Sequence, residues 1–546
     1  MSSAILKSFF FVLYLVGSTE AFLFDKVRNN TEWWGYVNVR PQAYMFYWMY
    51  EHVEPENRPL ILWLQGGPGA SSVGFGNFME IGPLDINLQH RKYTWLTEAS
   101  LLFIDNPVGS GFSYVTSDSA LAKDVQTIAH DLITTLKTVL KKALFRKVPL
   151  YIFSESYGGK MASVFSLRLW KAIQNGELKC NFRGLAMGDS WIDPSKIVLS
   201  WAPFLHTMSL VDENGRALVN RYAEKVAGLA KLGQYADATR MWRATENVVA
   251  NLTGGVNWYN ILQWSPRATR DSYQNQEFID TPQHIKDLFW TWTGPLQISK
   301  LSKLMNTVIR KKLGVIPSHV VWGSQAGRVF AAQVGEFMKA ETKVVNELIR
   351  SSRLKVVVYS GQLDLIVATL GTEKWVDDLD IAMAFKNTKR RILVDPITQT
   401  VMGYKRSLKN FSFYWMLNAG HMIPSDNPTG ALQMDPEIDR ETEHEEFGKI
   451  LDGLQVEDGD FTKQEIERAT SNLKEGKQSG PDNIPPEVLK RCDLDDIILE
   501  FANKLLNDNV EPEQWSEIDL LLLPKTGNLS GQSVIHCSKN GQQDDT

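Results

Sequence analysis

Cysteine is scarce in this sequence, with three in 546 residues, and Cys180 is the only one before residue 435. No disulfide can therefore form within residues 1–434, and no Cys/His spacing resembles a metal site. Long hydrophobic runs are also missing, because the run Phe9–Gly17 has roughly half of the ~20 residues that span a bilayer. These absences exclude a disulfide-stapled fold and predict no membrane span, so a large buried core must provide the stability.

A strong excess of one charge is missing as well, since the net charge is −5, but the two parts of the chain differ. Residues 1–434 contain 47 Lys and Arg against 36 Asp and Glu, whereas residues 435–546 contain 11 against 27. Only four of the 58 aromatic residues lie in the second part. We expect an aromatic-rich globular part followed by an acidic C-terminal appendage, whose charge would repel nucleic acid.

Residues 1–21 have the order of a secretory signal peptide, with Lys7 before the apolar run and small residues at Thr19 and Ala21. The mature chain would then begin near Phe22, in a secreted or lysosomal protein. A short membrane anchor is the alternative. Sequons, which the secretory pathway can glycosylate, start at Asn29, Asn251, Asn410 and Asn528.

Short apolar runs bounded by glycine, proline or polar residues predict strands buried on both faces of a mainly parallel sheet. These runs are Leu60–Leu64, Leu101–Ile104, Leu150–Phe153, Gly184–Met187, Lys355–Tyr359 and Phe411–Leu417. Helical periodicity over Lys123–Leu144 and Ser154–Gln174 alternates with them, which predicts a doubly wound α/β fold. An antiparallel hairpin of Trp34–Val39 and Tyr44–Glu51 is expected before them.

Residues 194–345 interrupt this alternation and divide the α/β core into residues 22–193 and 346–434. The interrupting segment is rich in tryptophan and predicts helices over Arg216–Leu232, Asp237–Val249 and Pro282–Phe289. An insertion between two sheet elements lies over the C-terminal edge of the sheet, where α/β sites form, so we expect a helical cap. A separate helical domain is the alternative.

Residues 150–160 predict a strand, a tight turn and a helix with Ser156 at the apex, as in the nucleophile elbow of α/β hydrolases. The turn requires small residues two before and two after the serine, and Ser154 and Gly158 meet that requirement. The same fold needs an acid and then a histidine, each after a strand. Asp364 and His421 follow two of the predicted strands in that order. A turn residue and a structural loop histidine are the alternatives for these two positions.

Six segments in order resemble the serine carboxypeptidase family, most closely its retinoid-inducible type. They are Trp63–Ser72, Glu80–Pro83, Asp105–Tyr114, Ser154–Gly159, Met187–Pro194 and Asn418–Pro424. The resemblance covers about residues 30–434 and implies an α/β-hydrolase fold. It also implies a serine-type hydrolase that removes C-terminal residues from peptides or proteins without a metal or cofactor, and it admits a homodimer.

The resemblance also implies roles for single residues. Ser156 would be the nucleophile, His421 the general base and then acid, and Asp364 the residue that orients the imidazole. The backbone N–H groups of Gly67 and Tyr157 would form the oxyanion hole. The substrate's terminal carboxylate would be received by Gln65, Gly66, Glu80 and Glu155.

A carboxylate cannot dock against two ionised glutamates, so Glu80 and Glu155 would have to share a proton. We therefore expect an acidic pH optimum for peptide hydrolysis. The sequence also departs from the family, since Ala70 stands where a cysteine is common and Gln65 where an asparagine is common. A catalytically silent binding or protective protein on the same scaffold is the alternative, because fold alone does not establish activity.

The family pattern stops at Met434, and Pro436 would end a helix there. Residues 435–460 predict an acidic linker. Residues 461–546 predict a partly helical segment that resembles the opening part of reverse transcriptases from non-LTR retrotransposons. No metal-binding aspartate hairpin is present, so no polymerase function is expected. We interpret the appendage as chimeric, and loss of the closing helix would leave a misfolded product as a further alternative.

Overall fold

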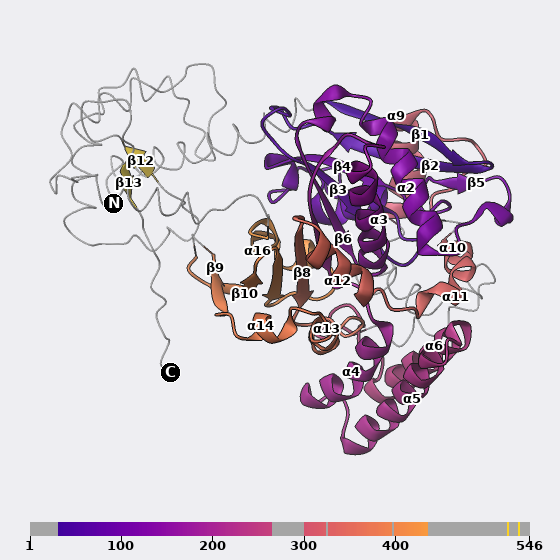
Figure 1. The fold of residues 1–546 in the computed structure, drawn as a ribbon, viewed down its shortest axis with the longest axis vertical. Coiled ribbons are helices and arrows are strands. Elements are labelled where there is room, and N and C mark those ends of the chain that lie inside the picture. Colours follow the sequence, from indigo (N-terminus) through magenta and orange to yellow (C-terminus); the bar gives the residue numbers. More distant parts are fainter. Residues whose placement is uncertain are drawn as a thin grey trace, which may run out of the picture. The chain divides into compact units, whose positions relative to one another are not determined.

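The computed structural model describes residues 31–264, 300–323, 326–395, 398–434, 521–523 and 533–535. Contacts divide the chain into two units, one of residues 29–438 and one of residues 1–28 with 439–546. The first unit contains the large sheet and its helices (Figure 1). The predicted signal peptide, helix Pro282–Phe289 and acidic linker lie outside the described residues.

The centre of the large sheet consists of parallel strands in the spatial order β4-β3-β6-β7-β8-β11. Their bounds are β3 Leu60–Leu64, β4 Ser100–Ile104, β6 Pro149–Glu155, β7 Asn181–Gly188, β8 Lys355–Gly361 and β11 Phe411–Met416. Every predicted strand is present to within a few residues. The mostly parallel, doubly wound sheet is confirmed, because these strands are almost wholly buried and carry the continuous apolar runs that such burial requires.

Antiparallel strands extend the sheet on both sides. On one side lie β1 Glu32–Arg40, β2 Ala43–Tyr50 and β5 Tyr114–Val115, and on the other β9 Arg391–Val394 and β10 Val401–Leu408. The hairpin of β1 and β2 is confirmed. The strands β9 and β10 were not predicted. Both are partly exposed and carry charged residues, so they lack the apolar signal of the central strands, and β9 forms the edge of the sheet.

Helices cover the sheet and connect its strands. Helix α3 contacts both α2 and α12. The observed helix α2 is shorter than the predicted helix Lys123–Leu144, because it begins after its N-cap Asp124 and ends at Val139. The helices of the core are α2 Val125–Val139, α3 Tyr157–Gln174, α12 Thr342–Ser351, α13 Thr369–Val376, α14 Ala382–Lys386, α15 Ile423–Asp426 and α16 Pro428–Leu432. The core also contains the π-helix η1 Ser72–Ile81 and the short 3-10 turns η2 Trp95–Thr97, η3 Asp118–Ala120 and η4 Ala143–Arg146.

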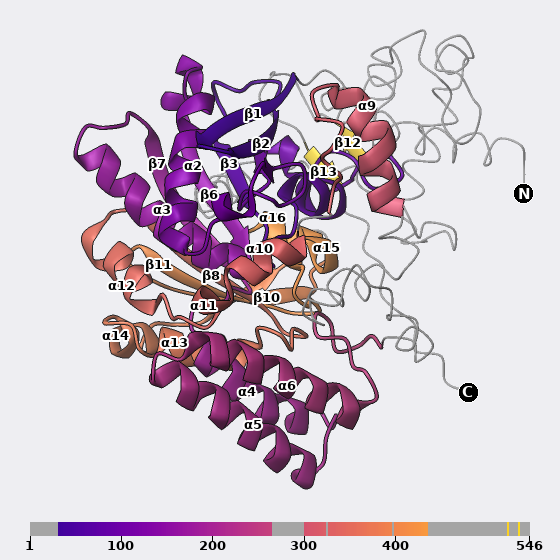
Figure 2. The same ribbon diagram turned by 90° about the vertical axis from the view of Figure 1, so that its right-hand side faces the viewer.

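Most of the described helices between β7 and β8 belong to the predicted cap segment. They are α4 Pro194–Thr207, α5 Glu213–Lys231, α6 Tyr235–Thr253, η8 Met305–Ile309, α9 Arg310–Leu313, α10 Ala326–Ala332 and α11 Val334–Phe337. Helices α4, α5 and α6 pack on one another beside the sheet (Figure 2). Within the segment α11 contacts α6, and the core helix α13 contacts α4, so the segment is joined to the core by packed helices.

Large aromatic side chains fill the interior of this unit. Trp48, Trp63, Trp201, Trp242 and Trp375 are all fully buried, and they come from both the sheet and the inserted helices. Each such ring removes a large apolar area from water, which provides the stability that the lack of disulfides demands.

In the second unit the structure describes two short antiparallel strands, β12 Leu521–Leu523 and β13 Ser533–Ile535. These two strands were not predicted, because consecutive leucines and a Ser-Val-Ile run suit a strand as well as a helix when periodicity is absent. The rest of the prediction for the appendage lies outside the described residues. Across the described part of the chain, no helix combines the length and apolar character needed to cross a membrane.

Candidate active site

Ser156 occupies a sharp turn between β6 and α3. Its backbone has φ 62° and ψ −131°, a region that is costly for a residue with a side chain. The turn is held by three backbone hydrogen bonds, because Ser156 N donates to Gly188 O at 2.9 Å and Ser156 O accepts from the N–H groups of Gly159 and Trp191, both at 3.0 Å. A Cβ on Gly158 would lie 2.3 Å from Leu64 O, so only glycine fits there. The local packing thus holds Ser156 at the start of a helix.

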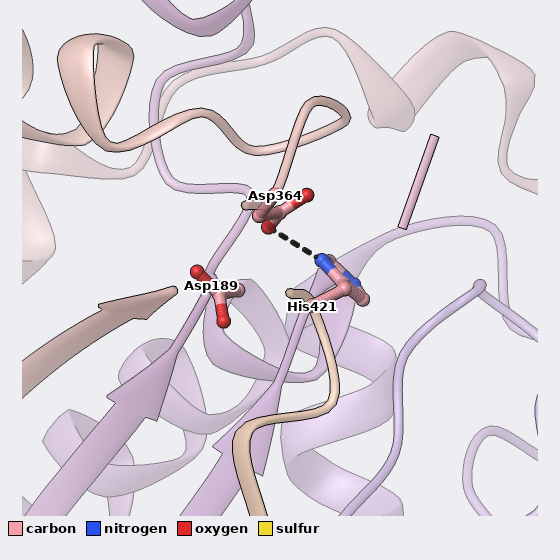
Figure 3. Close-up of side chains that lie close together, drawn as sticks. All are labelled: Asp189, Asp364 and His421. Carbon is pink, nitrogen blue, oxygen red and sulfur yellow. Dashed lines mark hydrogen bonds and ion pairs between the residues drawn. The ribbon is translucent and has the colours of Figure 1, made fainter. Parts of the chain in front are cut away.

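His421 and Asp364 lie after β11 and β8, which are parallel neighbours, so their loops meet at one edge of the sheet. Nδ1 of His421 and Oδ2 of Asp364 are 2.7 Å apart, and both side chains are fully buried (Figure 3). The loop is anchored by His421 N, which donates to Tyr259 O at 2.7 Å, and the Tyr259 ring packs edge-on against the imidazole. The bond at Nδ1 fixes how the ring faces the rest of the site.

The other imidazole nitrogen is free to act on a ligand. Within the described residues, Nε2 of His421 has no hydrogen-bond partner, and Ser156 Oγ is therefore not bonded to it. Hydrogen bonds between a nucleophile and its base are often long in ligand-free enzymes. Burial lowers the pKa of His421 to about 4. The imidazole is thus neutral above that pH and can accept a proton.

A cluster of buried carboxyl groups lies beside Ser156. Gln65 Nε2 donates to Glu155 Oε1 at 2.6 Å, and Gln65 Oε1 accepts from Trp63 Nε1 at 2.7 Å. Glu80 from η1 lies next to both Gln65 and Glu155. Among the residues the structure describes, both oxygens of Glu80 and Oε2 of Glu155 have no hydrogen-bond partner. These oxygens are available to a ligand or to each other.

Burial dominates the protonation of this pair. It raises the pKa of Glu80 to about 7, although Glu155 and Gln65 act in the opposite direction. Burial and the neighbouring Glu80 raise the pKa of Glu155 well above its usual value. Two buried carboxyl groups this close cannot both be ionised at acidic pH, so they hold at least one proton.

Gly66 and Gly67 bring the backbone after β3 against the serine turn. A Cβ on Gly66 would lie 2.5 Å from Ser156 Cβ and 2.8 Å from Tyr157 N, so a side chain is excluded. Gly67 has φ +110°, which favours glycine. Tyr157 is the first residue of α3, where N–H groups have no partner within the helix. Backbone donors therefore converge beside Ser156.

A cleft of about 410 Å³ opens onto Ser156. One part of its wall consists of residues predicted from the sequence, and the other is aromatic or apolar. Its lining is Gln65, Gly66, Gly67, Ala70, Glu155, Ser156, Tyr157, Trp191, Trp242, Tyr259, Phe337 and Ile366. Sequence reasoning missed Trp242 and Phe337, because they come from α6 and α11 in a segment whose placement no motif indicates.

Asp189 was also missed, although it lies in one of the six family-like segments. Its carboxyl, that of Asp364 and the His421 imidazole offer atoms within 4.8 Å of one another, and in the described part of the chain they are the one such group that could hold a metal ion. Because Nδ1 is already bonded to Asp364, the arrangement suits a hydrogen-bonded triad of side chains better than a metal site.

The sequons differ in their surroundings. Asn251 is exposed on α6. Asn410 is half-buried, and its Nδ2 donates to the carbonyls of Ile349, Ser352 and Leu354. Asn29 and Asn528 lie outside the described residues.

Comparison with known proteins finds a matching family model and relatives that share the description serine carboxypeptidase. A family model described as serine carboxypeptidase matches residues 23–437. The chain is 47% identical over 431 residues to the retinoid-inducible serine carboxypeptidase of Mus musculus, covering 77% of this chain and 94% of the mouse protein. It is 40% identical over 426 residues to serine carboxypeptidase-like 51 of Arabidopsis thaliana, covering 75% and 92%.

The structure is similar to that of Kex1Δp, a prohormone-processing carboxypeptidase from Saccharomyces cerevisiae. The TM-score is 0.63 at 21% identity, and the match covers 74% of this chain and 90% of the yeast chain. At this identity the likeness shows the fold, which agrees with the predicted α/β-hydrolase architecture.

Proposed function

The chain belongs to the serine carboxypeptidase family, and we propose that its residues 22–434 hydrolyse the C-terminal peptide bond of peptides or proteins through an acyl-enzyme. The observation that carries the exopeptidase assignment is the buried Glu80–Glu155 pair, of which Glu155 lines the cleft at Ser156. Both oxygens of Glu80 and Oε2 of Glu155 have no hydrogen-bond donor among the described residues. A site that must accept a terminal carboxylate needs acids that can hold a proton, and burial provides that condition here.

In the first half of the reaction, Ser156 Oγ attacks the scissile carbonyl while Nε2 of His421 takes its proton. The hydrogen bond from Nδ1 to Asp364 keeps the proton-accepting nitrogen facing the serine and stabilises the imidazolium that forms. His421 then protonates the leaving amine, which departs as a free amino acid. In the second half a water molecule, deprotonated by His421, hydrolyses the ester on Ser156.

Two backbone N–H groups, those of Gly67 and Tyr157, are the donors for the oxyanion. Their support is the close approach of the Gly66–Gly67 backbone to Ser156 and the position of Tyr157 at a helix start. Fixed donors of this kind stabilise negative charge that develops in the transition state and need no reorganisation.

The substrate's terminal carboxylate would be bound by Gln65, the Gly66 N–H and the protonated Glu80–Glu155 pair. Gln65 supports this role because its side chain is held between Trp63 and Glu155, so the amide cannot rotate away. The aromatic wall of Trp191, Trp242 and Phe337 would contact substrate side chains.

Entry into the secretory pathway through residues 1–21, glycosylation at Asn29 and Asn251, and a secreted or lysosomal location belong to the same proposal. Asn410 is left out, because a glycan would be attached to the Nδ2 that donates to three backbone carbonyls. A homodimer and the absence of nucleic-acid binding stay predictions. The acidic linker 435–460 and the chimeric origin of residues 461–546 stay predictions as well.

The test uses the full chain and the variant Ser156→Ala. We expect a fluorophosphonate probe to label the wild type and not the variant, and the wild type to release a free amino acid from a peptide at pH 5. The matched substrate is the same peptide with a C-terminal amide, which lacks the carboxylate. Labelling without release of an amino acid would contradict the carboxypeptidase proposal and favour a silent binding protein.

A further inference from the structure

Asp189 follows β7 and has an unusual backbone conformation, with φ 40° at a residue that carries a side chain. Its N–H donates to Tyr359 O at 2.9 Å, and its Oδ1 accepts from Gly361 N at 2.8 Å. The strained residue is therefore tied to the end of β8, the strand that leads to Asp364. Such strain persists only where the surroundings hold it, and it is concentrated at functional sites.

The Asp189 carboxyl lies beside the pair formed by Asp364 and His421 (Figure 3). All three side chains are fully buried. In the described part of the chain, Oδ2 of Asp189 has no hydrogen-bond donor. The titratable groups that face Asp189 are Asp364, His421, Glu155 and Tyr359, and none of these is a lysine or arginine.

Two carboxylates cannot both be ionised in this setting, because no lysine or arginine is among the described groups that face them and burial disfavours charge. Burial raises the pKa of both carboxyl groups well above the usual value. Asp364 has the better support for a negative charge, since Val367 N donates to it at 3.1 Å, the Ile366 backbone donates as well, and Nδ1 of His421 lies 2.7 Å from its Oδ2, where the Nδ1–H tautomer of the ring donates to a carboxylate. Asp189 has only the Gly361 N–H and the Ser360 hydroxyl as donors among the described residues. Together these two donors stabilise a carboxylate less than donors that include an imidazole which can become charged. The proton therefore belongs on Asp189.

We propose that Asp189 is a positioning residue, a buried neutral carboxylic acid whose Oδ2–H donates a hydrogen bond to Asp364 and holds that carboxylate against the imidazole of His421. The proposal rests on the proposed function only for its effect on turnover, because the protonation of Asp189 is a property of the free protein.

The donor has a definite task in the reaction. When His421 becomes an imidazolium, Asp364 must remain a carboxylate that accepts from Nδ1. A carboxylate buried among backbone donors alone would take up a proton more readily and would then donate to Nδ1, which places the imidazole proton on Nε2 and blocks it as a base. A neutral acid at Asp189 stabilises the ionised form of Asp364 without adding a second negative charge.

The experiment compares Asp189→Ala and Asp189→Asn in the full chain. Alanine removes the donor, and we expect kcat for peptide hydrolysis to fall roughly 10- to 100-fold with KM little changed, as for loss of one hydrogen bond to a charged group. Asparagine keeps a neutral donor of the same shape and should restore most of that loss. The donor role would be contradicted if Asp189→Ala and Asp189→Asn lost kcat to the same extent, or if both were as active as the wild type.

The pH profile separates a neutral Asp189 from an ionised one. If Asp189 is neutral, Asp189→Asn leaves the lower limb of the profile at the wild-type pH. An ionised Asp189 would raise the pKa of His421, so Asp189→Asn would in that case shift the limb to lower pH. Such a shift would overturn the proposal.

Infrared spectra of the free protein provide a readout that needs no substrate. We expect the wild type labelled with ¹³C-aspartate to show the carbonyl band of a protonated aspartic acid at pH 7, and Asp189→Asn to lack it. Absence of the band in the wild type would overturn the proposal even if Asp189→Ala fails to fold. Loss of activity on chelation would also overturn it, because a cation would then occupy the three side chains.

The rate of fluorophosphonate labelling keeps the two proposals separable. It depends on His421 and Asp364 but not on a peptide, so Asp189→Ala should be labelled more slowly even if peptide hydrolysis fails. Peptide turnover failing in the wild type would contradict the proposed substrate, whereas equal labelling of wild type and Asp189→Ala would contradict the positioning role.

Discussion

Replacing Glu80 by glutamine removes a titrating group from the centre of the site without changing its shape. Glu80 is fully buried in η1, and burial raises its pKa from 4.5 to about 7. The neutral acid is favoured in the folded protein, and the unfolded chain releases the proton at lower pH. A glutamine stays neutral in both states, so Glu80→Gln isolates the cost of holding this proton.

The sign follows from the raised pKa. Stability from Glu80 is fully present below pH 4.5 and is lost as the pH rises from 4.5 to about 7, because only the unfolded state ionises freely in that window. A shift of that size corresponds to about 3 kcal/mol. We therefore expect the free energy of unfolding of Glu80→Gln, compared with that of the wild type, to increase by about 3 kcal/mol as the pH rises from 4 to 8.

Urea unfolding of the full chain at pH 4, 6 and 8 measures this difference. The matched control is Glu177→Gln, an exposed residue just after α3, which should follow the wild type at every pH. If the stability curves of Glu80→Gln and the wild type run parallel from pH 4 to pH 8, Glu80 is ionised in the folded protein and the reasoning is refuted.

The same group sets the upper limb of activity. Above about pH 7 we expect kcat/KM for peptides with a free terminal carboxylate to fall roughly tenfold per pH unit, because the acid pair loses a proton and repels the substrate. A C-terminal amide should show only the lower limb near pH 4, which His421 sets for both substrates. Identical profiles for acid and amide would contradict the assignment of Glu80.

Lys160 on α3 is buried and donates to the backbone carbonyls of Glu336, Phe337 and Lys339 at 2.6 to 3.3 Å. Lys160→Met should therefore lower the free energy of unfolding by about 3 kcal/mol, as measured by urea unfolding. Lys171→Met on the same helix is the control and should leave it unchanged. Trp242→Ala should lower the free energy of unfolding by about 3–5 kcal/mol, because the ring fills the core, and should raise KM for peptides, because the ring also lines the cleft. Trp264→Ala, at an exposed position, is the control. Removal of residues 435–546 should leave kcat/KM unchanged and should not lower the secreted yield, and a loss of either would show that the appendage supports the fold.

The order of strands and helices could be predicted because the central strands are buried on both faces, so their apolar runs are continuous. The edge strand β9 and its neighbour β10 could not be predicted, since solvent exposure permits charged residues such as Arg391 and Lys405, which lie opposite each other in the two strands. The predicted C-terminal end of α2 was too late, because the apolar pattern continues after Val139 into a 3-10 turn.

Ser156, Asp364 and His421 could be proposed from the sequence because each follows a strand, and the carboxyl ends of parallel strands share one edge. Asp189 also follows a strand, but nothing in its neighbours indicates that its carboxyl turns toward Asp364. That direction depends on φ 40° and on the bond to Gly361, which form only when β7 and β8 lie side by side.

The sequence alone determined the family, the chemical groups available for acyl transfer and the division between a globular part and an acidic appendage. These follow from local patterns of residue type, which burial and turn geometry impose on neighbours in the chain. Only the tertiary structure decided which acids are buried beside one another and which aromatic rings line the cleft. Desolvation and charge repulsion depend on distances between residues far apart in sequence, and no local pattern contains them.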